Sequence, residues 1–156
     1  METQVGLIRL WVYRSVSKLT PKQEDHILQL GTDFINQWAA HGSKLDSSFK
    51  ILNHHFLVFF VNEASASASG CSIDSSVALV REIEAKFDLG LLDRMQVPFF
   101  ENDEVVMRQF TDLKELYAQG VITDATKVFN LLLEDGNSFE DQWLVAFSES
   151  PYFKAI

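Results

Sequence analysis

The chain has 156 residues, a formal net charge of −9 at pH 7, and a hydrophobic content of 47%. This length suits one domain, or two very small ones, with an apolar core. Lysine and arginine are scattered singly rather than gathered in the basic stripe of a nucleic-acid-binding protein. The acidic balance also disfavours anionic membranes. We therefore expect neither nucleic acid nor a membrane among the partners.

A single cysteine excludes both an intramolecular disulfide and a thiolate zinc site. Met1–Gly6 lacks the basic and apolar stretches of a signal peptide, and the longest apolar run, Phe56–Val61, is too short to span a bilayer. The composition thus predicts a cytoplasmic protein. Thirteen phenylalanines, against three tyrosines and three tryptophans, predict a core or an adhesive face built on aromatic packing.

The beginning of the chain predicts a strand and then a helix. Residues 7–13 are β-branched, aromatic and mostly apolar, as in a strand. Thr20–Gln23 is typical of a helix start, with threonine as the N-cap and proline at the first helical position. Gly42 predicts the end of this helix. Its apolar face would be formed by residues at helical spacing, namely Ile27, Leu30, Phe34 and Trp38.

Two strands and a second helix are expected next. The strands would be joined by a turn near Asn53-His54. The second of them, Phe56–Val61, is apolar throughout, which favours a central position in a sheet covered on both faces. Ala64–Gly70 is rich in small residues and is expected to be a loop, and the helical pattern then runs over Val77–Phe87 and ends at Gly90.

The remainder of the chain is predicted to contain short strands and a short helix. Its polar segment, residues 134–141, is expected to be a loop. The other predicted elements are a hairpin around residues 101–103, a short helix between Thr111 and Gly120, and strands over residues 126–130 and 143–147.

These elements predict an α+β fold in one of two arrangements. In the preferred arrangement, residues 1–92 form a βαββα unit with an antiparallel sheet, and residues 93–156 form a small α+β unit of their own. In the alternative, the strand over residues 95–100 joins the first sheet. That arrangement would give a single ferredoxin-like βαββαβ domain with a C-terminal extension.

The C-terminal part carries a family resemblance. Phe110–Phe129, followed by Trp143–Phe147 and Ser150, resembles the bacterial GYF-like domain, with its short helix, Gly-x-Ile turn, Thr-x-Val strand and Trp-led strand. The resemblance implies a small α+β unit. Members of the wider GYF family bind proline-rich peptides in an aromatic pocket. The Gly-Pro-Phe/Tyr step that helps to build that pocket is replaced here by Met107–Phe110.

The whole chain also resembles a family of short bacterial proteins commonly labelled "ABC transporter ATPase". The segments that carry this resemblance are Trp11–Tyr13, Trp38–Gly42, Ser48-Phe49, Gly70–Val77 and Phe129-Asn130. The label implies nucleotide hydrolysis, which requires a Gly-x-x-x-x-Gly-Lys-Ser/Thr loop around the phosphates. No Gly-Lys pair occurs anywhere in the sequence. We therefore expect no ATP hydrolysis.

The candidate functional site is the segment Gly70–Ser76, which contains the only cysteine and precedes the second predicted helix. Backbone N–H groups and the helix dipole at a helix start favour an anion, and they favour a thiolate over a thiol. The preferred hypothesis is a non-enzymatic protein that binds another protein or a small anionic ligand without a cofactor. Its ligand-binding residues would be Gly70, Ser72, Ser75 and Ser76.

A thiol-dependent enzyme is the alternative hypothesis. Cys71 would attack the substrate, His41 would accept the proton, and Asp74 would orient the histidine. The same segment also permits a purely local interpretation. In that case Ser72, Asp74 and Ser75 cap the helix, and Cys71 packs as a small apolar residue.

The sequence also bears on metal binding and on a structural role. His54-His55 would point to opposite faces of a strand, so the two rings are badly placed to chelate one ion, and we expect no metal site. A structural role, in which a phenylalanine-rich surface packs on a partner protein, is also open. Trp11, Trp38 and Trp143 are expected to be core or contact residues. In an alternative that the GYF-like resemblance allows, Trp143 and Phe99-Phe100 line an exposed groove for a partner.

Overall fold

The computed structural model describes residues 7–156 and divides into two compact units. The first unit contains the chain as far as Leu92 together with Glu134–Asn137, and the second contains Asp93–Leu133 and Ser138–Ile156. Each unit has its own antiparallel sheet and its own helices, so the fold class is α+β. No helix in the described range combines the length and the apolar composition needed to cross a membrane.

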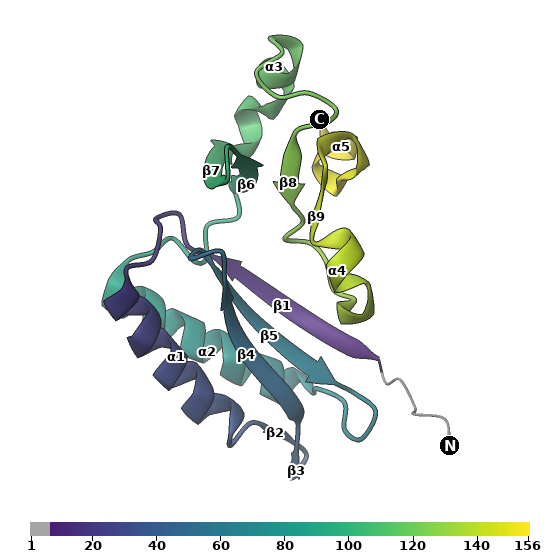
Figure 1. The fold of residues 1–156 in the computed structure, drawn as a ribbon. Helices are drawn as coiled ribbons and strands as arrows, with labels where there is room; N and C mark the ends of the chain where they lie inside the picture. The colour runs from purple at the N-terminus through teal and green to yellow at the C-terminus, as the bar shows by residue number, and fades with distance from the viewer. Residues whose placement is uncertain (1–6) are drawn as a thin grey trace. The chain divides into compact units, whose positions relative to one another are not determined.

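The first unit is built on a three-stranded sheet in the order β1-β5-β4, with a separate two-stranded hairpin of β2 and β3 (Figure 1). The prediction that the apolar strand would be central is confirmed, because β5 pairs with β1 on one side and with β4 on the other. The elements of this unit are β1 (Ile8–Arg14), α1 (Pro21–Ile35), β2 (Ala39–Ala40), β3 (Ser43–Lys44), β4 (Asp46–Leu52), β5 (Phe56–Asn62) and α2 (Gly70–Phe87).

Both helices cover the same face of this sheet. Alternate residues of β5 point to one face, and their side chains pack in one core with residues of both helices. The residues that show this are Leu57, Phe59 and Val61 from β5, Ile27 from α1, and Leu79, Val80 and Ile83 from α2. Phe56 and Val58, which point to the opposite face, are fully buried as well, as expected of a central strand.

Helix α1 begins where the sequence predicts but ends earlier. Thr20 and Gln23 form the expected capping box, in which each side chain accepts a hydrogen bond from the backbone N–H of the other residue. The helix then stops at Ile35, with Asn36 as the C-cap, so the predicted end at Gly42 is wrong. The reason is tertiary, because the indole Nε1 of Trp38 turns inward and donates a hydrogen bond to the Ser72 carbonyl at 2.7 Å.

Helix α2 ends in a turn that a single carboxylate organises. Asp88 at the C-cap has a left-handed backbone conformation, with φ of 52°. The carboxylate of Glu84 then accepts hydrogen bonds from the backbone N–H groups of Leu89, Gly90 and Leu91, each at 3.0 Å. This arrangement satisfies three donors in the segment that leaves the helix.

The short segment Glu134–Asn137, distant in sequence, pairs with part of the edge of β1. The Leu10 N–H donates to the Glu134 carbonyl at 3.2 Å, and Arg9 forms an isolated antiparallel bridge with Asp135. The prediction of a plain loop over residues 134–141 is therefore wrong. Besides this pairing, the stretch contains η2 (Gly136–Ser138) and α4 (Phe139–Gln142).

The second unit contains a four-stranded antiparallel sheet in the order β7-β6-β8-β9. Because β6 pairs with β7 and β8, it does not join the first sheet, and the ferredoxin-like alternative is wrong. The further elements of this unit are β6 (Gln96–Glu101), β7 (Glu104–Gln109), η1 (Phe110–Asp112), α3 (Leu113–Ala118), β8 (Lys127–Phe129), β9 (Leu144–Ala146), η3 (Phe147–Glu149) and α5 (Pro151–Ala155).

The core of the second unit is separate from that of the first. Its fully or nearly buried members are Val97, Phe99, Leu113, Ile122, Val128, Val145, Phe147 and Tyr152. Helix α5 was not predicted, although its start carries a readable signal. Ser150 accepts a hydrogen bond from the Phe153 N–H, and Pro151 occupies the first helical position.

Candidate functional site

The segment Gly70–Ser76 is the beginning of α2 rather than a loop before it. Ser69 is the N-cap, and its hydroxyl accepts a hydrogen bond from the Ser72 N–H at 3.2 Å. In return, the Ser69 N–H donates to the Ser72 hydroxyl oxygen at 2.7 Å. This reciprocal pair is a capping box with serine at both positions. The expected start of the helix at Val77 is thus wrong by about two turns.

The serine hydroxyls of the predicted site donate their protons within the helix. Ser72 Oγ donates to the Ser69 carbonyl, Ser75 Oγ to the Cys71 carbonyl and Ser76 Oγ to the Ile73 carbonyl. Ser72 and Ser76 are also buried, with 2% and 1% of their surface exposed. As folded, these hydroxyls stabilise the first two turns of α2 and do not converge on a common point.

Three predicted site residues are exposed to solvent. Cys71 and Asp74 lie on the first turns of α2, one turn apart and open to solvent. His41 is not at a helix end, because it forms the tight turn between β2 and β3 together with Gly42, with φ values of 50° and 80°. Within residues 7–156, no hydrogen bond or ion pair joins Cys71, His41 and Asp74 to one another.

The approach to α2 also carries a negative charge. The Glu63 carboxylate accepts a hydrogen bond from the Ala68 N–H at 2.8 Å, two residues before Gly70. The same carboxylate, with 8% of its side chain exposed, lies 3.7 Å from Arg9 Nε. A carboxylate near the start of the helix already interacts favourably with the helix dipole, and it weakens the attraction for a second anion.

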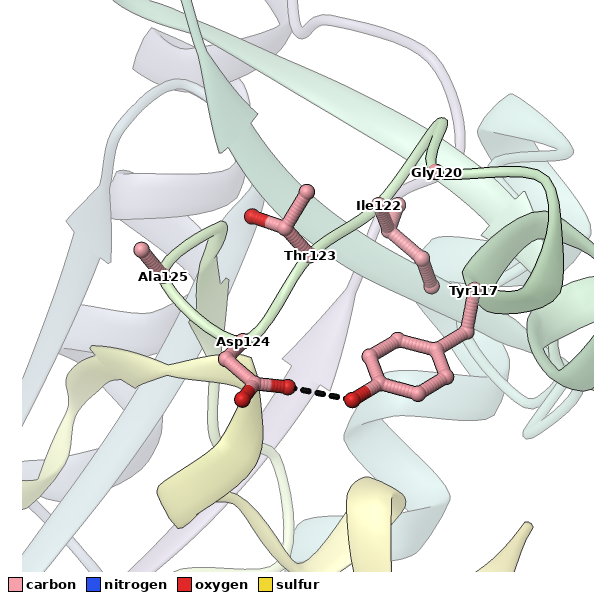
Figure 2. A pocket seen from close by; sticks show the side chains of 6 residues that line it. All are labelled: Tyr117, Gly120, Ile122, Thr123, Asp124 and Ala125. Carbon is pink, nitrogen blue, oxygen red and sulfur yellow. Dashed lines mark hydrogen bonds between the residues drawn. The ribbon is translucent and has the colours of Figure 1, made fainter.

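A different concave surface lies in the second unit, between α3 and the turn that follows it. It is an open cavity of about 590 Å³, and Figure 2 shows the side chains that line it. The residues that line it are Tyr117, Gly120, Ile122, Thr123, Asp124 and Ala125. We call this surface the Tyr117 groove.

The polar end of the Tyr117 groove is a phenol paired with a carboxylate. The hydroxyl of Tyr117 donates a hydrogen bond to Asp124 Oδ1 at 2.5 Å (Figure 2). This hydrogen bond, together with smaller effects of desolvation and of the Asp124 charge, raises the pKa of the Tyr117 phenol above its usual value. The protonated phenol is thus favoured, and it serves as the hydrogen-bond donor of the pair.

The Tyr117 ring is held in place from behind. Its centroid lies 5.9 Å from that of Phe147 and 5.6 Å from that of Phe153. The turn is fixed as well, because the Thr123 N–H donates to Thr126 Oγ1 at 2.8 Å. Ile122, at 0% exposure, anchors the same turn in the core. A groove supported in this way is largely formed before any ligand arrives.

Sequence reasoning missed this groove, and its only candidate for an aromatic groove, at Trp143 and Phe99-Phe100, was an alternative to a core role. Trp143 and Phe99 are 8% and 0% exposed. Trp143 packs on Phe129 and stacks on Phe139, with centroids 5.3 and 5.2 Å apart. The interpretation of Trp143 as a core residue is confirmed, and the alternative of an exposed groove at Trp143 and Phe99 is wrong. The available signal for the real groove was the turn after Gly120, but only the structure brings Asp124 against Tyr117.

The two adjacent histidines bind different partners in the first unit. His54 Nδ1 lies 2.6 Å from Glu24 Oε1, and His55 Nδ1 lies 2.9 Å from the Ser15 carbonyl. Across the part of the chain that the structure describes, no three His, Cys, Asp or Glu side chains are grouped so that they could hold a metal ion.

The buried histidine predicts a pH dependence of stability. Burial lowers the pKa of His55 below 6.5, despite the opposing hydrogen bond to Ser15, so the unfolded chain binds more protons than the folded chain. We therefore expect this contribution to be complete above about pH 6.5 and to be lost progressively as the pH falls below that value. Urea unfolding between about pH 7.5 and 5.5 measures it.

A pair of variants isolates this effect. His55→Gln removes the titrating group. The free energy of unfolding of this variant should therefore depend less steeply on pH than that of the wild type. The exposed neighbour provides the control, and His54→Gln should retain the part of the slope that His55 supplies. An identical slope in wild type and His55→Gln would contradict the prediction.

Comparison of the chain with family models, with curated proteins and with solved structures gave no match in any of the three.

Proposed function

We propose that this is a non-enzymatic, cytoplasmic binding protein that holds an extended segment of another protein in the Tyr117 groove. The observation that carries the proposal is the groove itself, an open cavity lined by an aromatic ring, by a turn with Thr123 and Ala125 exposed, and by a carboxylate at one end. Recognition sites of this kind combine mostly apolar walls with a few fixed polar groups.

The chemistry of the groove favours a proline-rich segment with a basic residue. A proline ring packs well on an aromatic face and loses little entropy on binding, because its backbone is already extended. The exposed Asp124 carboxylate offers a partner for lysine or arginine. The net charge of −9 would also speed association with a basic segment. The C-terminal part also resembles the GYF-like domain, whose wider family binds proline-rich peptides, but the Gly-Pro-Phe/Tyr step of that family's pocket is absent from this chain.

The test is a titration of the ¹⁵N-labelled protein with two synthetic peptides. Both are proline-rich, and they differ only in carrying two arginines or two glutamates. We expect amide shifts over residues 117–125 with the arginine peptide and much weaker binding of the glutamate peptide. No shift with either peptide, or shifts confined to other residues, would overturn the proposal.

Two variants sharpen the test. Asp124→Asn should weaken binding of the arginine peptide by about fivefold, which corresponds to an exposed ion pair of about 1 kcal/mol. Asp112→Asn removes an exposed carboxylate of the same unit that does not line the groove, so it should leave the affinity unchanged. Equal affinities of the two variants would show that Asp124 has no part in binding.

The hypothesis of a small anion at Gly70–Ser76 stays a prediction with its own test. The backbone N–H groups of Gly70 and Cys71 lie at the exposed start of α2, and neither has a hydrogen-bond acceptor within residues 7–156. Titration with inorganic phosphate should shift these two amides if they bind the anion. Unchanged amide shifts at saturating phosphate would end this hypothesis.

The hypothesis of a reactive thiol is tested separately. Alkylation of Cys71 in the native protein, followed against pH, reports on one site because the chain has one cysteine. An apparent pKa well below 8.5 would support the thiol-dependent enzyme, and His41→Ala should then slow the reaction. Alkylation with an ordinary pKa would instead leave Cys71 as an exposed residue without special reactivity.

A further inference from the structure

Within residues 7–156, β7 is an edge strand of the second sheet and pairs only with β6. It spans six residues, whereas β9 at the opposite edge spans three. Its centre consists of Val105, Val106 and Met107, without the lysine, proline or bulge that usually protects an edge strand. By contrast, the edge of β1 in the first unit is partly occupied by Glu134–Asn137.

The turn before β7 determines which backbone groups face outward. Asn102 and Asp103 have φ values of 52° and 62°, which is the backbone of a two-residue type I′ turn. Glu101 and Glu104 then form the hydrogen-bonded pair next to the turn, and the pairs alternate from there. The N–H and C=O groups of Val105 and Met107 therefore point away from β6.

The charges along β7 are incompletely paired within one chain. Glu104 lies directly opposite Glu101, a like-charge pair that disfavours the hairpin. Arg108 compensates only Glu101, to which it donates three hydrogen bonds at 3.0 and 3.1 Å. Glu104 is exposed, and no cation among the described residues forms an ion pair with it.

We propose that two copies of this chain pair antiparallel along β7, with the two-fold axis at Val106. In this register Val105 of each copy lies opposite Met107 of the other, and the outward N–H and C=O groups of both residues exchange hydrogen bonds. Glu104 of each copy then lies opposite Arg108 of the other. This is a non-hydrogen-bonded pair, in which side chains approach most closely.

The charge pattern selects both the occupant and the register. A shift of the axis to Val105 would place Glu104 opposite Val106, and a shift to Met107 would place Arg108 opposite Val106. Only the axis at Val106 joins Glu104 to Arg108, and it does so twice in one dimer. An isologous contact of this kind is self-complementary, so it closes after two copies.

The edge of β4 is the competing surface. This strand also carries charges of opposite sign, at Asp46 and Lys50. However, Lys50 and two serines lie within the strand, and such polar edges oppose strand pairing. The apolar centre of β7 makes it the better edge, and a matched variant of β4 distinguishes the two.

The test uses two charge-reversed variants of the full chain in analytical ultracentrifugation. Wild type should sediment as a dimer. E104R alone would place two arginines opposite each other at each end, and R108E alone would place two glutamates there, so each variant should be monomeric or at least tenfold weaker. A 1:1 mixture of the two variants restores both pairs and should form a heterodimer.

The controls separate this contact from loss of folding and from the β4 edge. D46R makes the same charge change on β4 and should leave the dimer intact. Met107→Pro removes an outward N–H without cutting a hydrogen bond to β6, and it should dissociate the dimer while the melting curve stays cooperative. A wild type that remains monomeric at the highest soluble concentration would overturn the proposal. A dimer that D46R dissociates, or a variant mixture that stays monomeric, would overturn it equally.

Discussion

Replacement of Phe59 by alanine is expected to lower the free energy of unfolding of the first unit by about 3–5 kcal/mol. Phe59 is fully buried in the central strand, at 0% exposure. Its ring contacts four other aromatic rings, with centroid distances between 4.9 and 6.2 Å, those of Tyr13, Phe34, Trp38 and Phe49. Truncation removes these contacts and leaves a cavity that the rigid elements around it cannot close.

Urea unfolding followed by tryptophan fluorescence measures this loss, because Trp38 lies 5.8 Å from Phe59. The matched control is Phe60→Ala, which makes the same chemical change at the next residue on the opposite face of the sheet. Phe60 is only partly buried, so its replacement should cost clearly less. Equal losses in the two variants would contradict a core centred on Phe59.

Replacement of Gly31 by alanine is expected to destabilise the first unit by about 1–3 kcal/mol, although alanine favours a helix over glycine by about 1 kcal/mol. Gly31 is buried on the face of α1 that packs against β4. An added Cβ would lie 2.2 Å from Cδ1 and 2.4 Å from Cε1 of the Phe49 ring. That ring is 8% exposed and packs on Phe59, so it has no free space into which to move.

Thermal and urea unfolding of Gly31→Ala and of three further variants, Thr32→Ala, Phe49→Leu and the Gly31→Ala/Phe49→Leu double variant, test this steric explanation. Thr32→Ala, at the exposed neighbouring position of α1, should change stability by less than about 0.5 kcal/mol. In a Phe49→Leu background the Gly31→Ala penalty should shrink, because the smaller side chain leaves room for the Cβ. A stabilising effect of Gly31→Ala in wild type would mean that α1 does not approach β4 this closely.

The start of α1 and the end of α1 show where sequence reasoning succeeds and fails. The start was predictable, because Thr20 and Gln23 satisfy each other's backbone N–H groups across three residues. The end of α1 was not predictable, because Trp38 lies four residues after Phe34, the spacing expected if the apolar face of the helix continued. In the structure the two rings still meet, at 5.1 Å, but through a turn that carries Trp38 toward Ser72.

The start of α2 was missed for a different reason. Its capping box uses Ser72 where the usual pattern has glutamate or glutamine, and the preceding run of alanine and serine looks like a loop. The helix is extended by contacts that are distant in sequence, since Ser72 and Ser76 are buried. The residues proposed as ligands from the sequence thus lie in a helix whose hydroxyls are already used.

By itself, the sequence determined the α+β class, the central apolar strand, the hairpin turns at Asn53-His54 and at residues 101–103, and the cap of α1. These features depend on backbone hydrogen bonds and side-chain spacing within a few residues, so their signals are local. Only the tertiary structure decided where α1 ends, that Glu134–Asn137 pairs with β1, and that Asp124 meets Tyr117. Each of these three features depends on contacts with residues that cannot be identified from the local sequence pattern. At these positions the free energy of packing outweighs the local conformational preference.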